Sequence, residues 1–293
     1  MSLISIFLDT LINGIMIGTV YGLAGIGLAI IFGVLHIVNF AVGELIILGA
    51  YTTFWACILF NINPLFALIV SCIILALVFC AVEKLSIEPI LGSEEFVLMT
   101  LLITYALSLL LRNVQTVLWT GDFRIVPTPP EFMFLVTLGT TSMYFIRLLA
   151  FIISVVIVIF LYLFFTKTMT GRAIRAIADD VEAARLMGVS PTHIFLVTFG
   201  IAGIVTAVAG GLLGMIYPFN PASGAIYATK AFIVVVLGGM GNMVGAFIGG
   251  IILGLIEAFA GTIWIGGMKE VVSYLFFIII LLFKPTGLFR GRV

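Results

Sequence analysis

Few side chains in this sequence are of types and spacings that could do chemistry. The chain has two histidines, His36 and His193. It also has three cysteines, each of which lies in an apolar segment. It shows neither zinc-site nor disulfide spacing, no recognisable Ser–His–Asp or paired-carboxylate arrangement and no phosphate-binding G-x-x-x-x-G-K-[ST] loop. We therefore expect no catalytic residues, no metal site and no ATP bound to this chain.

The remaining candidates lie where polar residues and glycines interrupt long apolar runs. The first interruption spans residues 33–39 and is followed by Glu44, and the second is the glycine cluster 238–242. Backbone freed at such breaks can line a path through a membrane, and a carboxylate inside an apolar segment is a functional candidate. The alternatives are a helix-start charge for Glu44 and helix capping for the others. We predict a translocation path near six residues: His36, Asn39, Phe40, Glu44, Gly241 and Asn242.

A charged island at 171–189 stands between two long apolar stretches. Spaced at 100° per residue, its apolar side chains fall on one face of a helix and its charged side chains on the other, with Arg175 and Asp179 four residues apart. Gly188 and Pro191 end the helix. The pattern predicts an amphipathic helix. A helix lying on the membrane surface is the alternative, but its mixed charges disfavour that reading.

The composition requires a membrane around most of this chain. Of 293 residues, 63% are hydrophobic and 9% charged, whereas a soluble domain carries about 25% charged residues. No Asp, Glu, Lys or Arg occurs between Glu44 and Glu83 or between Arg185 and Lys230. A spanning helix needs roughly 20 apolar residues, and strict polar–apolar alternation, typical of a β-barrel, is absent.

The expected fold is all-α: one polytopic transmembrane helical bundle over residues 1–293, with about eight membrane segments and one or two broken or re-entrant helices. The predicted segments are 8–32, 41–60, 64–82, 96–113, 144–165, 192–216, 230–257 and 268–283. Residues 114–143 are predicted to form an irregular loop, because they contain three prolines and a Gly-Asp pair.

Orientation follows from the positions of Lys and Arg. They gather in the 166–191 loop and in the C-terminal tail (Lys284, Arg290, Arg292), which places both in the cytoplasm. Eight simple spans would leave the tail outside. We therefore predict that 230–257 breaks at its glycine cluster into two arms that enter and leave on the outer side. A weak match between 41–49 and 246–254 leaves open an inverted repeat, with chance as the alternative.

Two motifs carry a family resemblance. Glu182-Ala183-Ala184 followed by Gly188 resembles the E-A-A-x-x-x-G loop of permeases in ATP-binding-cassette importers. The stretches 171–189 and 31–44 are similar to the branched-chain amino-acid permease family, and the similarity extends over almost the whole chain, including the glycine-rich 238–254 region. Val42 stands where that family usually has histidine, and 194–197 lacks the proline of the fuller loop.

This resemblance implies a permease subunit of an importer in the cytoplasmic (inner) membrane of a prokaryote. It implies two ATPase subunits, which bind ATP and magnesium, a second, related permease, and a periplasmic or surface-tethered substrate-binding protein. No nucleic-acid partner is expected. The 166–191 loop would dock the ATPase. The residues implied in this coupling are Gly171, Arg172, Arg175, Asp179, Asp180, Glu182, Ala183, Ala184 and Gly188.

Several alternatives stay open. The chain could carry urea or short amides, or it could be a self-contained secondary transporter, although such a transporter needs more ionisable residues within its spans. An intramembrane enzyme is disfavoured because no nucleophile–base pair is found. We expect Lys230 and Glu257, which bracket one span, to be interfacial. We also expect a mostly apolar path without a fixed charged pocket, so that selectivity resides in the binding protein.

Overall fold

The computed structural model describes residues 3–132, 134–138, 141–263, 268–284 and 287–289. Arg290 and Arg292, two of the basic tail residues, lie outside this range. The α-helices, in chain order, are α1 (Leu3–Leu35), α2 (Val42–Phe60), α3 (Pro64–Val82), α4 (Phe96–Trp119), α5 (Phe145–Lys167), α6 (Met169–Asp179), α7 (Val181–Leu186), α8 (Pro191–Ile216), α9 (Ser223–Gly238), α10 (Met243–Ile263) and α11 (Met268–Phe283).

Shorter elements join these helices. A π-helical turn (Glu83–Ile87) and a 3-10 turn (Glu88–Ile90) extend α3, and another 3-10 turn (Pro130–Phe132) precedes a hairpin. The hairpin pairs β1 (Leu135–Leu138) with β2 (Thr141–Tyr144) in antiparallel register, with Leu135 opposite Tyr144. Apart from this hairpin and an isolated bridge between Arg124 and Phe219, the regular elements of the described residues are helical, which confirms the all-α prediction.

Seven helices in the described residues are long and apolar enough to cross a membrane: α1, α2, α3 with its extension to Ile90, α4, α5, α8 and α10. The apolar helices α9 and α11 are shorter, at 16 residues each. Many large apolar side chains on α3, α4 and α5 are exposed, including Leu77, Leu102 and Phe160. Such a surface suits lipid and not water, so the chain is a multi-pass membrane protein.

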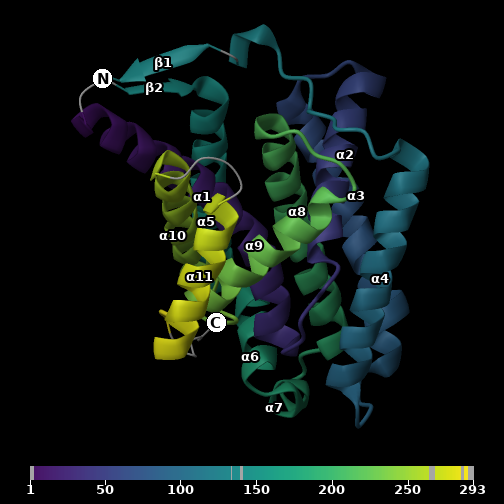
Figure 1. Cartoon of the computed structure of the whole chain (residues 1–293). Helices are drawn as coiled ribbons and strands as arrows, with labels where there is room; N and C mark the ends of the chain where they lie inside the picture. Colours follow the sequence, from purple (N-terminus) through teal and green to yellow (C-terminus); the bar gives the residue numbers. More distant parts are fainter. Residues whose placement is uncertain (1–2, 133, 139–140, 264–267, 285–286, 290–293) are drawn as a thin grey trace.

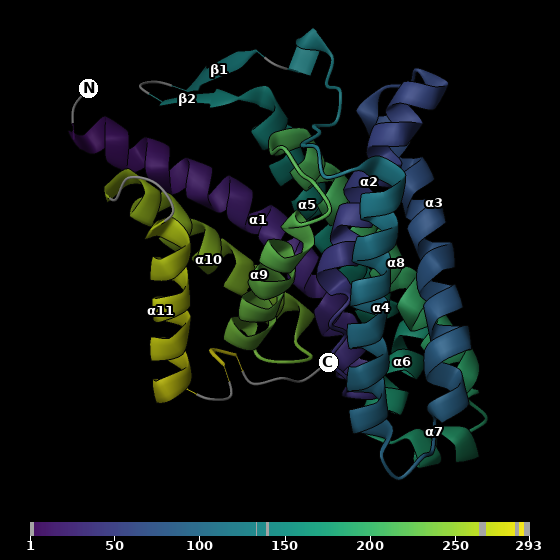
Figure 2. The same cartoon turned by 45° about the vertical axis from the view of Figure 1, so that its right-hand side comes forward.

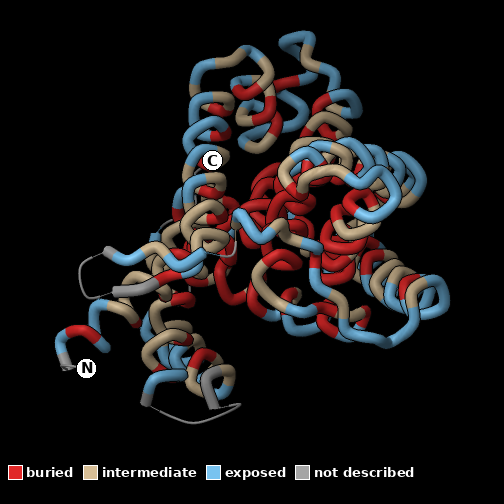
Figure 3. The backbone as a smooth tube through the Cα atoms, turned by 90° about the horizontal axis from the view of Figure 1, so that it is seen from above, coloured by how far each residue is buried: buried red, intermediate tan, exposed pale blue. Residues whose placement is uncertain are grey.

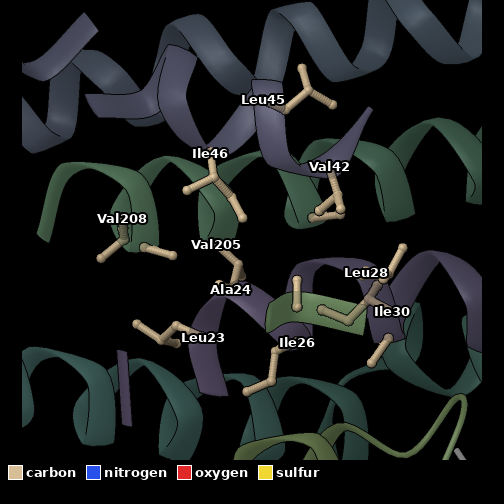
Figure 4. Close-up of a cluster of buried hydrophobic side chains, with 14 of the residues drawn as sticks. Leu23, Ala24, Ile26, Leu28, Ile30, Val42, Leu45, Ile46, Val205 and Val208 are labelled. Atoms are coloured by element: carbon tan, nitrogen blue, oxygen red, sulfur yellow. The ribbon is translucent and has the colours of Figure 1, made fainter. Parts of the chain in front are cut away.

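The bundle has a buried centre and an exposed rim. α1 crosses the molecule at a slant with α10 along it, α8 lies near the middle, and α3 and α4 stand at one side (Figures 1 and 2). Viewed from above, the buried residues concentrate in the interior and the outer helices are largely exposed (Figure 3). Figure 4 shows part of the core, where Ile26 of α1, Ile46 of α2 and Val205 of α8 are each buried.

Small residues allow α1 and α10 to pack at very short distance. A Cβ on Gly18 would lie 2.7 Å from the Cα of Ile251, and a Cβ on Gly254 would overlap the backbone of Gly14. Helices in lipid associate through such close backbone contact, because lipid offers no hydrophobic driving force for association. The first helix, α1, and the last of the seven candidate membrane helices, α10, therefore form one closely packed pair.

Most predicted segment boundaries are confirmed. The segment 64–82 coincides with α3, 268–283 coincides with α11, and 192–216 lies one residue inside α8. The segment 230–257 is two helices, α9 and α10, separated at residues 239–242. Because α9 runs toward the end of the bundle that carries α7 and α10 returns, the pair enters and leaves at the same end (Figure 2). That this end lies outside stays a prediction, and α10 is not a short arm, since it is long enough to cross a membrane.

Because α9 and α10 turn back on each other, α11 ends at the same end of the bundle as the basic 166–191 segment. The lower end of α11 lies at the same end as α6 and α7, and the hairpin β1–β2 lies at the opposite end with the start of α1 (Figure 1). We call these the α7 end and the hairpin end. The backbone N–H of Leu288 donates to the carbonyl of Leu237, which anchors the chain after α11 beside the end of α9.

Two local predictions are wrong. Residues 114–143 are not an irregular loop throughout, because α4 continues to Trp119 and the hairpin β1–β2 begins at Leu135. The island 171–189 is not one helix. Asp180 adopts an extended conformation, with φ −158° and ψ 112°, and separates α6 from α7. Its Oδ1 accepts hydrogen bonds from the N–H groups of Glu182 and Ala183, which caps α7.

Candidate functional site

The first break begins at His36, whose φ of 56° ends α1 in the left-handed region. Asn39 is 2% exposed, and its Oδ1 accepts a hydrogen bond of 2.9 Å from the N–H of Ala41. The turn that Asn39 stabilises leads directly into α2. The predicted path residue Asn39 therefore supports the backbone of the break, whereas His36 is exposed at its edge.

The end of this break packs against α9. Phe40 stacks on Phe232 with ring centroids 5.6 Å apart. Glu44, in the first turn of α2, is 3% exposed, and a Cβ at Gly224 would lie 3.1 Å from its Oε1. Gln115 of α4 donates from Nε2 to the backbone oxygen of Glu44 at 2.9 Å. Glu44 is therefore a buried carboxylate of α2 beside α9, and its role in the path stays a prediction.

The second break is made of left-handed glycines and a cap. Gly239 and Gly241 have φ values of 89° and 83°, which residues other than glycine rarely adopt. Asn242 then caps α10, since its Oδ1 accepts from the N–H of Gly245 at 2.9 Å. The glycine cluster read from the sequence is thus a tight turn between two antiparallel arms.

The α6–α7 segment, residues 169–186, is fixed to the bundle by its apolar face. Ile174 and Ile177 are buried, and so is Ala184, whereas Val181, assigned to the same face, is exposed. Gly171 packs so closely on the end of α5 that a Cβ there would overlap the carbonyl oxygen of Phe164. The exposed side chains include Arg172, Asp180, Glu182 and Ala183.

Each of the two breaks shares a cavity with the α6–α7 segment. An open cavity of about 930 Å³ is lined by His36 of the first break together with Asp179, Asp180, Glu182 and Gly188. A smaller cavity of about 120 Å³ is lined by Arg175 of α6 together with Gly241 and Asn242 of the second break. The structure therefore joins the two groups of predicted site residues at the α7 end, except for Asn39, Phe40 and Glu44, which line neither cavity.

Sequence reasoning missed a buried charged group. Lys230 and Glu257 are 6% and 8% exposed, and their ion pair spans 2.8 Å, so the expectation that both are interfacial is wrong. Tyr21 donates to Glu257 at 3.0 Å and accepts from Lys230 at 2.9 Å. Two lone opposite charges in a charge-poor stretch were the available signal, because charges inside a membrane are expected to pair.

A third cavity, of about 460 Å³, lies at the hairpin end. Asp9 and Asn13 of α1 line it, together with Arg147 of α5, Tyr217 and Glu257. Arg147 donates from Nη1 to Asn13 at 2.8 Å. This cavity therefore has charged side chains in its lining, and the expectation of a mostly apolar path stays a prediction. Within the described ranges, no cluster of three or more His, Cys, Asp or Glu could hold a metal ion.

Comparisons with known proteins agree with the architecture. The family model described as "Branched-chain amino acid transport system / permease component" matches residues 10–282. The high-affinity branched-chain amino acid transport system permease protein BraD of Pseudomonas aeruginosa is 32% identical over 298 residues, covering 96% of this chain and 95% of BraD.

Two further relatives are permeases of the same description. The high-affinity branched-chain amino acid transport system permease protein LivH of Escherichia coli K12 is 31% identical, covering 96% of this chain and 95% of that protein. A probable branched-chain amino acid transport permease protein LivH of Methanocaldococcus jannaschii is 28% identical, over 91% and 87% of the two chains. With a family model and relatives that match nearly its full length, the chain belongs to the permease component family of branched-chain amino acid transport systems.

Proposed function

We propose that this chain is the membrane-spanning permease subunit of an ATP-driven importer of branched-chain amino acids in the cytoplasmic membrane of a prokaryote. The observation that carries the proposal is that each helix break lines a cavity together with residues of the α6–α7 segment. A surface segment that reaches two interruptions of membrane helices can transmit an outside movement to the interior. The names of the relatives support the substrate class.

The proposed partners occupy opposite ends of the bundle. An ATPase subunit docks on the exposed side of α6–α7, where Glu182 and Ala183 lie, and supplies the ATP and magnesium chemistry. A binding protein delivers the amino acid at the hairpin end. A second, related permease, with its own ATPase, completes the transporter. This chain moves the substrate and breaks no covalent bond.

The proposed mechanism follows from the two cavities. When the ATPases close, they displace α6–α7, and the side chains of Ile174 and Ile177, which are buried against the bundle, pass the movement on to it. The displacement changes the distances of Asp179 and Glu182 from His36 across the large cavity. It also changes the distance between Arg175 and Gly241 across the small cavity. Left-handed residues at both breaks absorb the change in backbone direction. The pathway thereby switches from outward to inward access.

The test is to purify the complex through a tag on this chain and to measure ATPase co-purification and leucine uptake. Glu182→Leu should lose both, because it places a large apolar side chain on the docking surface. Glu131→Leu is the matched control for co-purification, since Glu131 is an exposed acid in the turn before the hairpin, at the opposite end from α7, and it should keep the ATPase. If Glu182→Leu retained the ATPase and imported leucine normally, docking on α6–α7 would be wrong.

The substrate class is tested separately in proteoliposomes that contain the native complex. Uptake of L-leucine, L-isoleucine and L-valine is compared with uptake of urea and acetamide, each with its ATP dependence. Saturable, ATP-dependent uptake of the branched amino acids is expected. Uptake of urea or acetamide in their place would retain the permease assignment and overturn the substrate class.

A further inference from the structure

We propose that the cavity at the hairpin end is a binding site for a zwitterionic α-amino acid, in which Arg147 holds the carboxylate and Asp9 holds the ammonium. The inference rests on the proposed function, because it takes an amino acid as the substrate, and it places that substrate within this chain. The cavity is bounded by α1, the first turn of α5 and the last turns of α10.

The positive group is held in place by a neighbour on α1. Asn13 accepts a hydrogen bond from Arg147 Nη1 at 2.8 Å, and its own Nδ2 donates to the backbone oxygen of Asp9 at 2.8 Å. One asparagine thus fixes the guanidinium close to the turn of α1 that carries Asp9. A guanidinium has five donors in a planar fork that matches a carboxylate, so Arg147 is suited to a ligand carboxylate.

The negative group has an unmet requirement. Asp9 Oδ1 is buried and accepts no hydrogen bond from the described residues. Within those residues the ion pair closer than 4.0 Å joins Lys230 to Glu257, and Asp9 has no such partner. A buried carboxylate oxygen without a donor is costly and calls for an explanation. A ligand ammonium in the cavity supplies the missing donor and the missing charge.

The second carboxylate of the cavity is already neutralised. Glu257 is bound by Lys230 and by the hydroxyl of Tyr21, both of which are buried behind it. The lining therefore presents one uncompensated positive group, Arg147, and one uncompensated negative group, Asp9. A ligand with a single charge satisfies one of them, whereas a zwitterion satisfies both.

Size and apolar surface agree with an aliphatic amino acid. The volume is about 460 Å³, which holds such a molecule with several waters, and Ile17 and Ala258 provide apolar wall. Gly261 also lines the cavity, and a Cβ built on it meets no atom within 4 Å. A side chain at position 261 would therefore point into open space, which makes it a position for a probe.

The experiment uses Gly261→Cys in the complete complex in proteoliposomes, labelled with the small uncharged thiol reagent N-ethylmaleimide. The native cysteines lie in α2 and α3, away from the cavity. L-leucine, isoamylamine, which lacks the carboxylate, and 4-methylpentanoate, which lacks the ammonium, are compared as protectants, without the binding protein. L-leucine should protect at concentrations at least about tenfold lower than the other two, because each of them loses one charge-assisted contact.

Charge variants complete the test. In Gly261→Cys, adding Asp9→Asn or Arg147→Gln should raise the protecting leucine concentration about tenfold, and Arg147→Lys should raise it less. Gly121→Cys is the matched control. Gly121 lies just after α4 and does not line the cavity, and a Cβ there also meets nothing within 4 Å. Leucine should not protect it. If a charge variant fails to reach the membrane, the ranking of the three ligands on Gly261→Cys still decides.

The outcomes separate this inference from the proposed function. If the native complex imports leucine but leucine does not protect Gly261→Cys, the site is wrong and the function stands. If isoamylamine protects as well as leucine, the cavity is a cation site, which also overturns the inference. If no branched-chain amino acid is imported at all, the proposed function fails, whatever the labelling shows.

Discussion

Lys230 of α9 and Glu257 of α10 form an ion pair of 2.8 Å that joins the two arms on either side of the second break. Both side chains are buried, and the hydroxyl of Tyr21 on α1 bonds to each of them. The pair therefore ties three helices together in the interior of the bundle. The pair lies toward the hairpin end, so the arms are held together there while the glycine turn closes them at the α7 end.

This ion pair supports a prediction about stability. Lys230→Met should destabilise the protein by about 3–5 kcal/mol, because it leaves Glu257 buried without its countercharge. The double variant Lys230→Met/Glu257→Gln should recover most of the loss, since it buries no charge and keeps a partner for Tyr21. Thermal unfolding of the detergent-purified protein measures both. A double variant no more stable than the single one would show that the pair does more than balance charge.

A second prediction concerns Gly188, which follows α7 with a φ of 84°. A Cβ there meets nothing within 4 Å, so a substitution costs backbone strain and no clash. Gly188→Val should be the most harmful and Gly188→Asn the least, with roughly 1–2 kcal/mol at stake for a residue forced into the left-handed region. Leucine import normalised to the amount of membrane-inserted protein checks the order. Equal rates for both variants would contradict it.

A third prediction concerns the contact of α2 with α9. A Cβ on Gly43 would overlap the carbonyl oxygen of Gly224, so the backbone must shift in Gly43→Ala. We expect a loss of roughly 1–3 kcal/mol and a marked fall in transport, because Glu44 is the adjacent residue. The control is Gly200→Ala in α8, where the nearest atom to the new Cβ is Cys80 Sγ at 3.4 Å. It should behave as the native protein does.

A fourth prediction ranks four residues in and after the first break by their accessibility to a water-soluble reagent. His36 and Phe40 are exposed, whereas Asn39 and Glu44 are 2% and 3% exposed. In the nucleotide-free complex, His36→Cys and Phe40→Cys should react with a water-soluble thiol reagent faster than Asn39→Cys and Glu44→Cys. If the break moves during transport, ATP should change the rate at His36, which lines the large cavity. Uniform protection of all four positions would place the break in a static helix interface.

Local signals explain why some of the fold was predictable. The start of α3 was clear because Asn63 caps the helix and Pro64 occupies its first turn. The second interruption was equally visible, since few residues other than glycine tolerate the φ values of Gly239 and Gly241. At the first interruption the left-handed residue is His36, which the sequence did not indicate. The start of α9 was placed seven residues late, at 230 and not at Ser223, because its first turns contain serine and threonine.

Other features depend on contacts between distant residues. Nothing local to Lys230 indicates that its partner is Glu257, 27 residues away on the returning arm. Asp9 and Arg147, which line the same cavity, belong to helices that are far apart in sequence. The split of 171–189 was closer to readable, because Asp180 stands two residues before Glu182 in a position typical of a helix cap. The regular amphipathic spacing on both sides of it favoured one continuous helix instead.

The cavities that α6–α7 shares with both breaks limit the number of states that the transporter can occupy. Because Arg175 faces the second break while Asp179 and Glu182 face the cavity of the first, one displacement of the segment alters both at once. A state in which only one break has rearranged would require α6–α7 to lie in two positions. The permease should therefore switch in a concerted, two-state manner, and a substitution at either break should shift the same equilibrium.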